Sequence, residues 1–136
     1  ARIRMHALNT EAVVGAAQGH PAVAALHWPG LATHPGHELA ARQQSGFGSL
    51  LSIDLVGGRP AAERFLTGLP IFHLAESLGG VESLICHPAT MTHAGMSPEA
   101  RAVAGIGDGL LRLSVGLESA EDLAAAVSEA LERARG

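Results

Sequence analysis

The sequence predicts a mixed α/β (α+β) fold, in which helices pack on one face of a small sheet. Stretches with the period of a helix alternate with short stretches in which every second residue is apolar. Glycine and proline mark the boundaries between these stretches. The 136 residues, of which 47% are hydrophobic, suffice for one core but not for two. We therefore expect residues 1–136 to form a single domain.

The first half of the chain contains two predicted helices and two predicted strands. The helices span residues 2–17, where apolar positions recur with helical spacing, and residues 38–44, which are good helix formers. A short strand at residues 23–28 is bounded by prolines, and a second at residues 46–58 ends at paired glycines. One face of the second strand carries Leu51, Ile53 and Leu55.

The second half contains three predicted helices. One spans residues 60–69, and the next runs from an N-cap at Ser97 to a stop at Gly105. The last begins at Ser119 and Asp122, which resemble a capping box with Asp in place of the usual Glu or Gln. Its predicted buried stripe consists of Leu123, Val127 and Leu131.

An arginine lies in the middle of the strand predicted at residues 110–117. Arg112, Ser114 and Gly116 alternate there with apolar residues, as in a half-buried strand. Two interpretations of Arg112 stay open from this pattern. Either it pairs with a structural carboxylate, that of Asp108 or Glu118, or its guanidinium fork binds the carboxylate of a ligand. The small residues at 114 and 116 leave room beside Arg112 in this interpretation, which favours the ligand.

A loop follows the brief strand predicted at residues 70–75. Its sequence, AESLGGVES, lacks the G-x-G-x-x-G spacing of a nucleotide-binding loop. It places Glu76 and Ser77 next to the flexible pair Gly79–Gly80, where side chains and backbone can approach a ligand. A solvated turn is the alternative interpretation.

Composition excludes several classes of protein. The net charge of −4 and the scattered arginines offer no basic stripe for nucleic acid. No apolar run approaches the ~18 residues that span a membrane, and the first residues do not resemble a signal peptide. The single cysteine, Cys86, cannot form an internal disulfide and suits the reducing cytoplasm, where we expect the protein to act. Because Ala1 is not Met and leads directly into a helix without a cap, we expect a piece of a longer protein.

The eight histidines and the cysteine do not predict a metal site. Zinc sites usually repeat ligand pairs at fixed spacings, whereas His34, His37, His87 and His93 are scattered, two of them next to proline. Cys86 follows Leu84 and Ile85, an apolar context in which cysteine is most often an inert, small hydrophobic residue. The chain contains no lysine, so no Schiff base can form on one of its side chains.

Two long stretches resemble one enzyme family. The first is HPAVAALHWPGLATHPGHELAARQQSGFGSLLSIDL, and the second is FHLAESLGGVESLICHPATMTHAGM followed by GIGDGLLRLSVGLES and the final helix. Together they are similar to the C-terminal domain of the pyridoxal-phosphate enzymes of cysteine and methionine metabolism. The resemblance covers nearly the whole chain. It implies the small C-terminal domain of a fold-type-I enzyme, with a mostly antiparallel sheet.

The resemblance also implies roles for four residues. Arg112, in the RLSVG motif, binds the α-carboxylate of the amino-acid substrate, and Ser77 lies beside the linkage between cofactor and lysine. Glu76 takes part in substrate recognition in the cystathionine enzymes, and Thr92 lines the same pocket. The cofactor lysine and the other cofactor-binding residues lie in a large domain upstream of residue 1. Hence the complete enzyme, not this chain, holds pyridoxal 5'-phosphate, and this chain alone is expected to be inactive, with no catalytic, cofactor-binding or metal-binding residue of its own.

The resemblance favours a methionine or cystathionine γ-lyase, which releases an α-keto acid, ammonia and a thiol by α,γ-elimination. The alternatives within the family are γ-replacement enzymes of transsulfuration, cystathionine γ-synthase and homoserine-ester sulfhydrylase. Expected partners are the amino-acid substrate, the large domain and further subunits, since family members are tetramers. An alternative from another class is a stand-alone, non-catalytic domain that binds an amino acid or assembles with a partner.

Overall fold

The computed structural model describes all 136 residues and contains five helices and five strands. The helices and strands alternate along the chain as the periodicity predicts, and most boundaries agree to within a few residues. In chain order they are α1 (Arg2–Ala17), β1 (Val23–His27), α2 (His37–Gln43), β2 (Leu50–Leu55), α3 (Gly58–Leu66), β3 (His73–Leu74), β4 (Leu84–Cys86), α4 (Pro98–Val103), β5 (Leu110–Ser114) and α5 (Ala120–Arg135).

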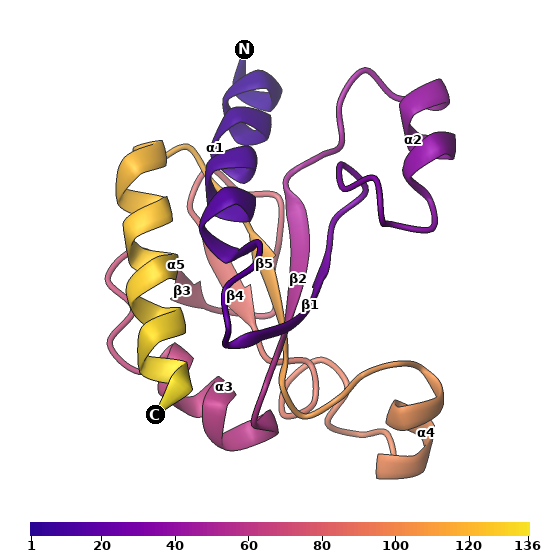
Figure 1. Ribbon diagram of the computed structural model, residues 1–136, viewed down its shortest axis with the longest axis vertical. Coiled ribbons are helices and arrows are strands. Elements are labelled where there is room, and N and C mark those ends of the chain that lie inside the picture. Colours follow the sequence, from indigo (N-terminus) through magenta and orange to yellow (C-terminus); the bar gives the residue numbers. More distant parts are fainter.

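The five strands form one sheet in the order β1-β2-β5-β4-β3. Every neighbouring pair is antiparallel except β3 and β4, which are parallel, so the expected mostly antiparallel sheet is confirmed. Helices α1, α3 and α5 cover one face, while α2 and α4 stand apart at opposite ends of the molecule (Figure 1). The sequence did not predict β4, because three apolar residues are too few to show a period.

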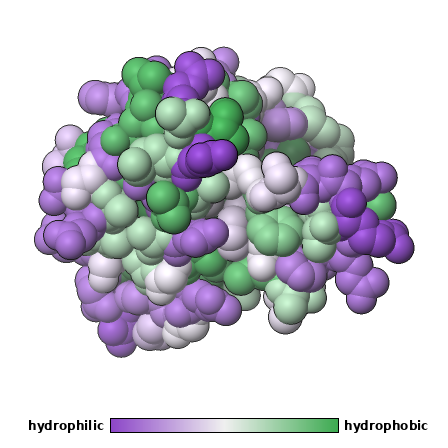
Figure 2. All heavy atoms as spheres, turned by 90° about the horizontal axis from the view of Figure 1, so that it is seen from above, coloured by the Kyte–Doolittle hydropathy of each residue, from purple (hydrophilic) through white to green (hydrophobic).

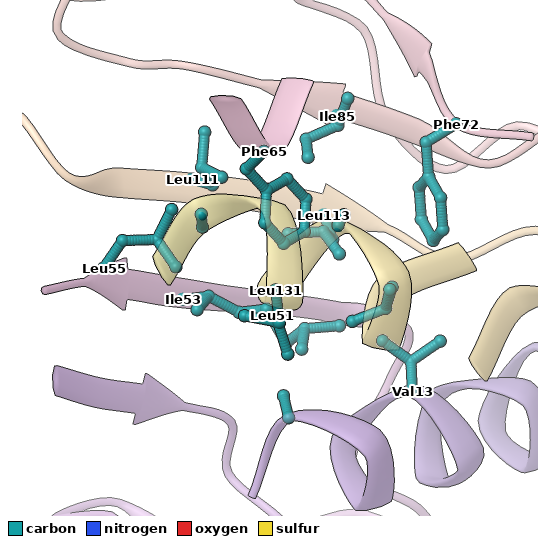
Figure 3. Close-up of a cluster of buried hydrophobic side chains, with 14 of the residues drawn as sticks. Val13, Leu51, Ile53, Leu55, Phe65, Phe72, Ile85, Leu111, Leu113 and Leu131 are labelled. Atoms are coloured by element: carbon teal, nitrogen blue, oxygen red, sulfur yellow. The ribbon is translucent and has the colours of Figure 1, made fainter. Parts of the chain in front are cut away.

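The core lies between the sheet and these three helices. Alternate residues of β2 and β5 point into it, so that Ile53, Leu111 and Leu113 are completely buried. They meet Phe65 from α3 and Leu131 from α5, which are also completely buried (Figure 3). The opposite residues of β5, Arg112 and Ser114, therefore lie on the other face of the sheet. Leu123, Val127 and Leu131 form the buried stripe that the sequence predicts for the last helix.

The predicted helix caps at Ser97, Gly105 and Ser119 are present, but the predicted capping box at Ser119 and Asp122 is only half formed. Ser97 accepts a hydrogen bond from the backbone N–H of Ala100, and Gly105 follows α4 with a φ of +74°. Ser119 accepts from the backbone N–H of Asp122 at 3.5 Å, but Asp122 returns no bond to the backbone of Ser119. The shorter aspartate side chain explains why the capping box is only half formed.

Apolar side chains are exposed along the first half of α1. Ile3, Met5 and Leu8 are 70%, 46% and 57% exposed, respectively. Viewed from the end at which α1 begins, green apolar residues gather among purple polar ones (Figure 2). None of the helices has both the length and the apolar content that a membrane span requires.

We predict that the isolated 136-residue chain self-associates, because an exposed apolar patch is stabilised by contact with another surface. Light scattering after size exclusion should give a mass that rises with concentration. The Leu8→Glu variant, which places a charge in the patch, should remain smaller at the same concentration. A monomeric mass for the unmodified chain at high concentration would contradict this prediction.

One surface pair links the loop before β1 to α5. The Nε2 atom of His20 donates to the carboxylate of Glu132 at 2.8 Å, while the Nδ1 atom accepts from the backbone N–H of Ala22 at 3.1 Å. The hydrogen bond from His20 holds the pKa of Glu132 below its ordinary value of 4.5. Because the folded-state pKa is lowered, the pair stabilises the fold above pH 4.5 and loses this effect as the pH falls through the folded-state pKa.

The His20→Ala variant should therefore raise the pKa of Glu132 back toward its ordinary value. The measurement is a carbon NMR titration of the Glu132 carboxyl group in both proteins. Any difference in unfolding free energy between them should shrink as the pH falls below 4.5. Identical Glu132 titration curves would show that the hydrogen bond has no such effect.

Candidate functional site

The candidate site is built on the connection between the two parallel strands. Since β3 and β4 run in the same direction, the chain must return from the end of one strand to the start of the other. Residues 75–83 make this return without a helix, and we call them the crossover segment. They lie alongside β5 and the residues that follow it, and hydrogen bonds join the two stretches at several points.

Arg112 lies at the centre of β5 on the face away from the helices. Its neighbours across the sheet are Ser52 of β2 and Cys86 of β4. The Nη2 atom donates to the main-chain carbonyl oxygens of Glu76 and Ser77, at 3.0 and 3.2 Å. The Nε atom is buried and has no hydrogen-bond partner. The Nη1 atom makes no protein hydrogen bond, so donors of the fork remain for a ligand.

The two carboxylates that the sequence offered as structural partners of Arg112 are engaged elsewhere. Asp108 pairs with Arg101 at 3.5 Å. Glu118 accepts from both the backbone N–H and the hydroxyl of Ser83, each at 2.7 Å. No carboxylate lies within 4.0 Å of the Arg112 guanidinium. The interpretation of Arg112 as half of a structural ion pair is therefore wrong.

The space above Ser114 and Gly116 is filled, contrary to the sequence-based expectation of open room. The Ser114 hydroxyl accepts from the backbone N–H of Gly79 at 2.8 Å. A Cβ added at Gly116 would lie 2.4 Å from the carbonyl oxygen of Val81. Small residues are required at these two positions because the crossover segment packs directly on them, not because a ligand does.

Glu76 and Ser77 are exposed and lie where Arg112 reaches the crossover segment. Their side chains make no hydrogen bond within the chain, although their carbonyl oxygens do. The guanidinium thus binds the backbone of two residues that carry a carboxylate and a hydroxyl, 36 and 35 positions before it in the sequence. This group has the polar chemistry to bind an amino acid, whose carboxylate is negative and whose ammonium group is positive.

Thr92 forms no hydrogen bond with Arg112, Glu76 or Ser77. Its hydroxyl lies 3.8 Å from the sulfur of Cys86, the cross-strand neighbour of Arg112, and 2.8 Å from the Nδ1 atom of His93. Cys86 itself is completely buried, in keeping with a small hydrophobic residue. Whether Thr92 lines a substrate pocket stays a prediction.

Three of the histidines form hydrogen bonds with main-chain groups. His34 accepts from the N–H of Gly36, His37 donates to the carbonyl of Pro29, and His87 donates to the carbonyl of Asp108. No group of three or more potential metal ligands gathers in the structure. A separate cleft of about 720 Å³ lies between the first turns of α1 and residues 43–49, and it does not include Arg112.

The chain does not contain the residue that would hold pyridoxal 5'-phosphate covalently. Imine formation needs an amine, and the sequence has no lysine. An imine with the cofactor would therefore need an amine from outside these 136 residues.

The sequence reasoning missed the contacts that hold the crossover segment in place. Ser83, Ser114 and Glu118 all take part, whereas the sequence suggested Ser114 only for its size, Glu118 only as a partner of Arg112, and Ser83 not at all. The signal that could have found them is the pair of small residues at alternate positions where β5 ends, Ser114 and Gly116, which indicates close approach of another backbone.

Known proteins resemble this chain over nearly its full length. The family described as Cys/Met metabolism PLP-dependent enzymes matches residues 1–132. Cystathionine gamma-synthase of Escherichia coli (strain K12) is 56% identical over 124 residues, and L-methionine gamma-lyase of Fusobacterium nucleatum subsp. polymorphum is 46% identical over 132. These alignments cover 91% and 97% of this chain.

The crystal structure of cystathionine gamma synthase from Xanthomonas oryzae pv. oryzae, in complex with aminoacrylate and cysteine, superimposes with a TM-score of 0.94 and 59% identity over 98% of this chain. The chain spans only 32% and 33% of the two relatives above and 35% of that structure. It therefore corresponds to one part of a larger enzyme. By sequence and fold together, the chain belongs to the Cys/Met metabolism family of PLP-dependent enzymes.

Proposed function

We propose that this chain supplies the carboxylate-binding part of the active site in a PLP-dependent enzyme that acts on a sulfur amino acid. The observation that carries the proposal is the environment of Arg112, a partly buried guanidinium with unused donors and no acidic partner. A planar fork of this kind binds a carboxylate through two parallel hydrogen bonds. Fixing the carboxylate orients the rest of the substrate for reaction.

Glu76 and Ser77 complete the substrate-facing surface in this proposal. The exposed carboxylate of Glu76 would attract an ammonium group, such as that of cysteine or of the distal end of cystathionine. The family resemblance implies that Ser77 lies beside the linkage between cofactor and lysine, and we propose the same role for its exposed hydroxyl here. The cofactor, when bound by the complete enzyme, supplies the electron sink for breaking bonds at the α and β carbons.

Members of the family catalyse either γ-elimination or γ-replacement. The sequence identity of this chain to relatives of each type helps to choose between the two reactions. Sequence motifs alone favour γ-elimination, as in methionine or cystathionine γ-lyase. The identities of 56% and 59% to cystathionine gamma-synthases, against 46% to L-methionine gamma-lyase, favour γ-replacement. We therefore propose γ-replacement, with cysteine as the incoming thiol, as the first candidate and γ-elimination as the second.

Product analysis of the full-length protein separates the two candidates. Incubation with an O-acylhomoserine and cysteine should yield cystathionine and the free acid if the enzyme is a γ-synthase. Incubation with methionine or cystathionine alone should yield an α-keto acid, ammonia and a thiol if it is a γ-lyase. Absence of both reactions in a protein that carries the cofactor would contradict the proposal.

The complete protein is proposed to be a cytoplasmic homo-oligomer, as the family resemblance implies. The non-catalytic alternative requires that no large domain accompanies this chain. The encoding reading frame decides this point, because a large domain with a cofactor lysine upstream of residue 1 would remove the alternative.

A further inference from the structure

We propose that Ser114 is a positioning residue for the substrate-binding surface, acting through the crossover segment (residues 75–83). This inference rests on the proposed function and deepens it. Ser114 does not reach the Glu76 or Ser77 side chains. It holds the backbone two residues beyond Ser77, and so sets where these side chains stand relative to Arg112.

The crossover segment is held mainly by bonds that involve side chains. The two carbonyl oxygens at its start accept from Arg112, and its middle is held where the Gly79 N–H donates to the Ser114 hydroxyl. Further along, the N–H of Leu117 donates to the carbonyl of Val81 at 2.8 Å. At its end, Ser83 binds the carboxylate of Glu118 and accepts from the N–H of Gly116.

Ser114 provides the first fixed point after the exposed residues 76–78. Its side chain is buried, with 1% of the residue exposed, and its Oγ atom lies 2.8 Å from the Gly79 nitrogen. Gly79 has a φ of +75°, a conformation that suits glycine, so the turn reverses direction at this residue. Without the serine oxygen, the Gly79 N–H would lose its acceptor, and the crossover segment would be held by hydrogen bonds only up to Ser77 and again from Val81 onward.

The hydrogen bond between Ser114 and Gly79 lies close to the proposed carboxylate-binding residue, Arg112. Arg112 and Ser114 lie two residues apart on the same face of one strand, so their separation is fixed by the backbone. The crossover segment is bonded to both side chains and therefore keeps a constant register with the carboxylate-binding guanidinium. A site of this kind binds its ligand well only if the polar groups stay within a fraction of an ångström of their places.

The test uses the full-length protein with its cofactor and compares Ser114→Ala with Thr10→Val. Thr10 is a matched control, because its hydroxyl is completely buried and donates to a main-chain carbonyl, that of His6, within α1. Ser114→Ala should raise KM for the amino-acid substrate about tenfold while changing kcat much less. Hydrogen exchange in the peptide that contains Gly79 should become faster. Thr10→Val should lower thermal stability but leave KM unchanged.

Two further variants keep the test decisive. Ser114→Cys keeps the side chain small but has a weaker acceptor, so it should raise KM less than Ser114→Ala does, and Arg112→Ala tests the proposed function itself. If Ser114→Ala and Ser114→Cys leave KM and Gly79 exchange unchanged while Arg112→Ala raises KM, the positioning role is refuted and the proposed function stands. If Arg112→Ala also leaves KM unchanged, the proposed function fails, and the positioning role fails with it.

Discussion

Replacement of Arg112 by alanine in the full-length protein is expected to lower kcat/KM for its amino-acid substrate by a factor on the order of 100 to 1000. The variant removes a charged group that can donate two parallel hydrogen bonds to a carboxylate. It also frees the carbonyls of Glu76 and Ser77. Steady-state kinetics with the reactive substrate measure the effect, which should be larger on KM than on kcat.

Two comparisons make this result specific. Arg112→Lys keeps the positive charge but loses the planar fork, so its kcat/KM should fall between those of the alanine variant and the unmodified enzyme. Arg101→Ala removes another half-buried arginine, one that pairs with Asp108, and should leave KM unchanged. Near-normal kinetics from Arg112→Ala would refute the assignment of the carboxylate site.

Gly116→Ala is expected to destabilise the fold by about 3 kcal/mol, at the upper end of the usual overpacking penalty. The new Cβ would lie 2.4 Å from the Val81 carbonyl oxygen and 2.6 Å from the Glu82 carbonyl carbon, both of them backbone atoms. The backbone there cannot retreat freely, since Gly116 also donates to Ser83 and its carbonyl accepts from Asn9 of α1. Urea unfolding followed by circular dichroism measures the change in free energy.

The matched control for this variant is Gly15→Ala. Gly15 lies within α1 with nothing inside 4 Å of its added Cβ. The same substitution should therefore stabilise the chain by about 0.5–1 kcal/mol, because alanine favours a helix. A Gly116→Ala protein as stable as the unmodified one would mean that the crossover segment is not packed on β5 as described.

The elements that the sequence predicts well are those with a long, clear period. The buried stripe of α5 and the alternation in β2 and β5 each involve several residues that share one environment, so their patterns are visible without the fold. β4 has only three residues, all of them buried, and nothing in such a short run distinguishes a strand from a loop.

The candidate site was predictable in part. The resemblance identified Arg112, Glu76 and Ser77, which the structure brings together. The environment of Arg112 was not predictable, because it depends on which segment crosses the sheet face. Alternation placed Ser114 on the same face, but only the parallel pairing of β3 and β4 puts the crossover segment above it.

The absence of an acidic partner for Arg112 has an electrostatic consequence. The guanidinium binds only carbonyl oxygens and forms no ion pair within the chain. A bound carboxylate supplies the missing negative charge, so substrate binding and folding are thermodynamically linked, and the ligand stabilises the folded state. The same charge attracts any small anion. Chloride or phosphate should therefore compete with the substrate, and the apparent affinity should fall as ionic strength rises.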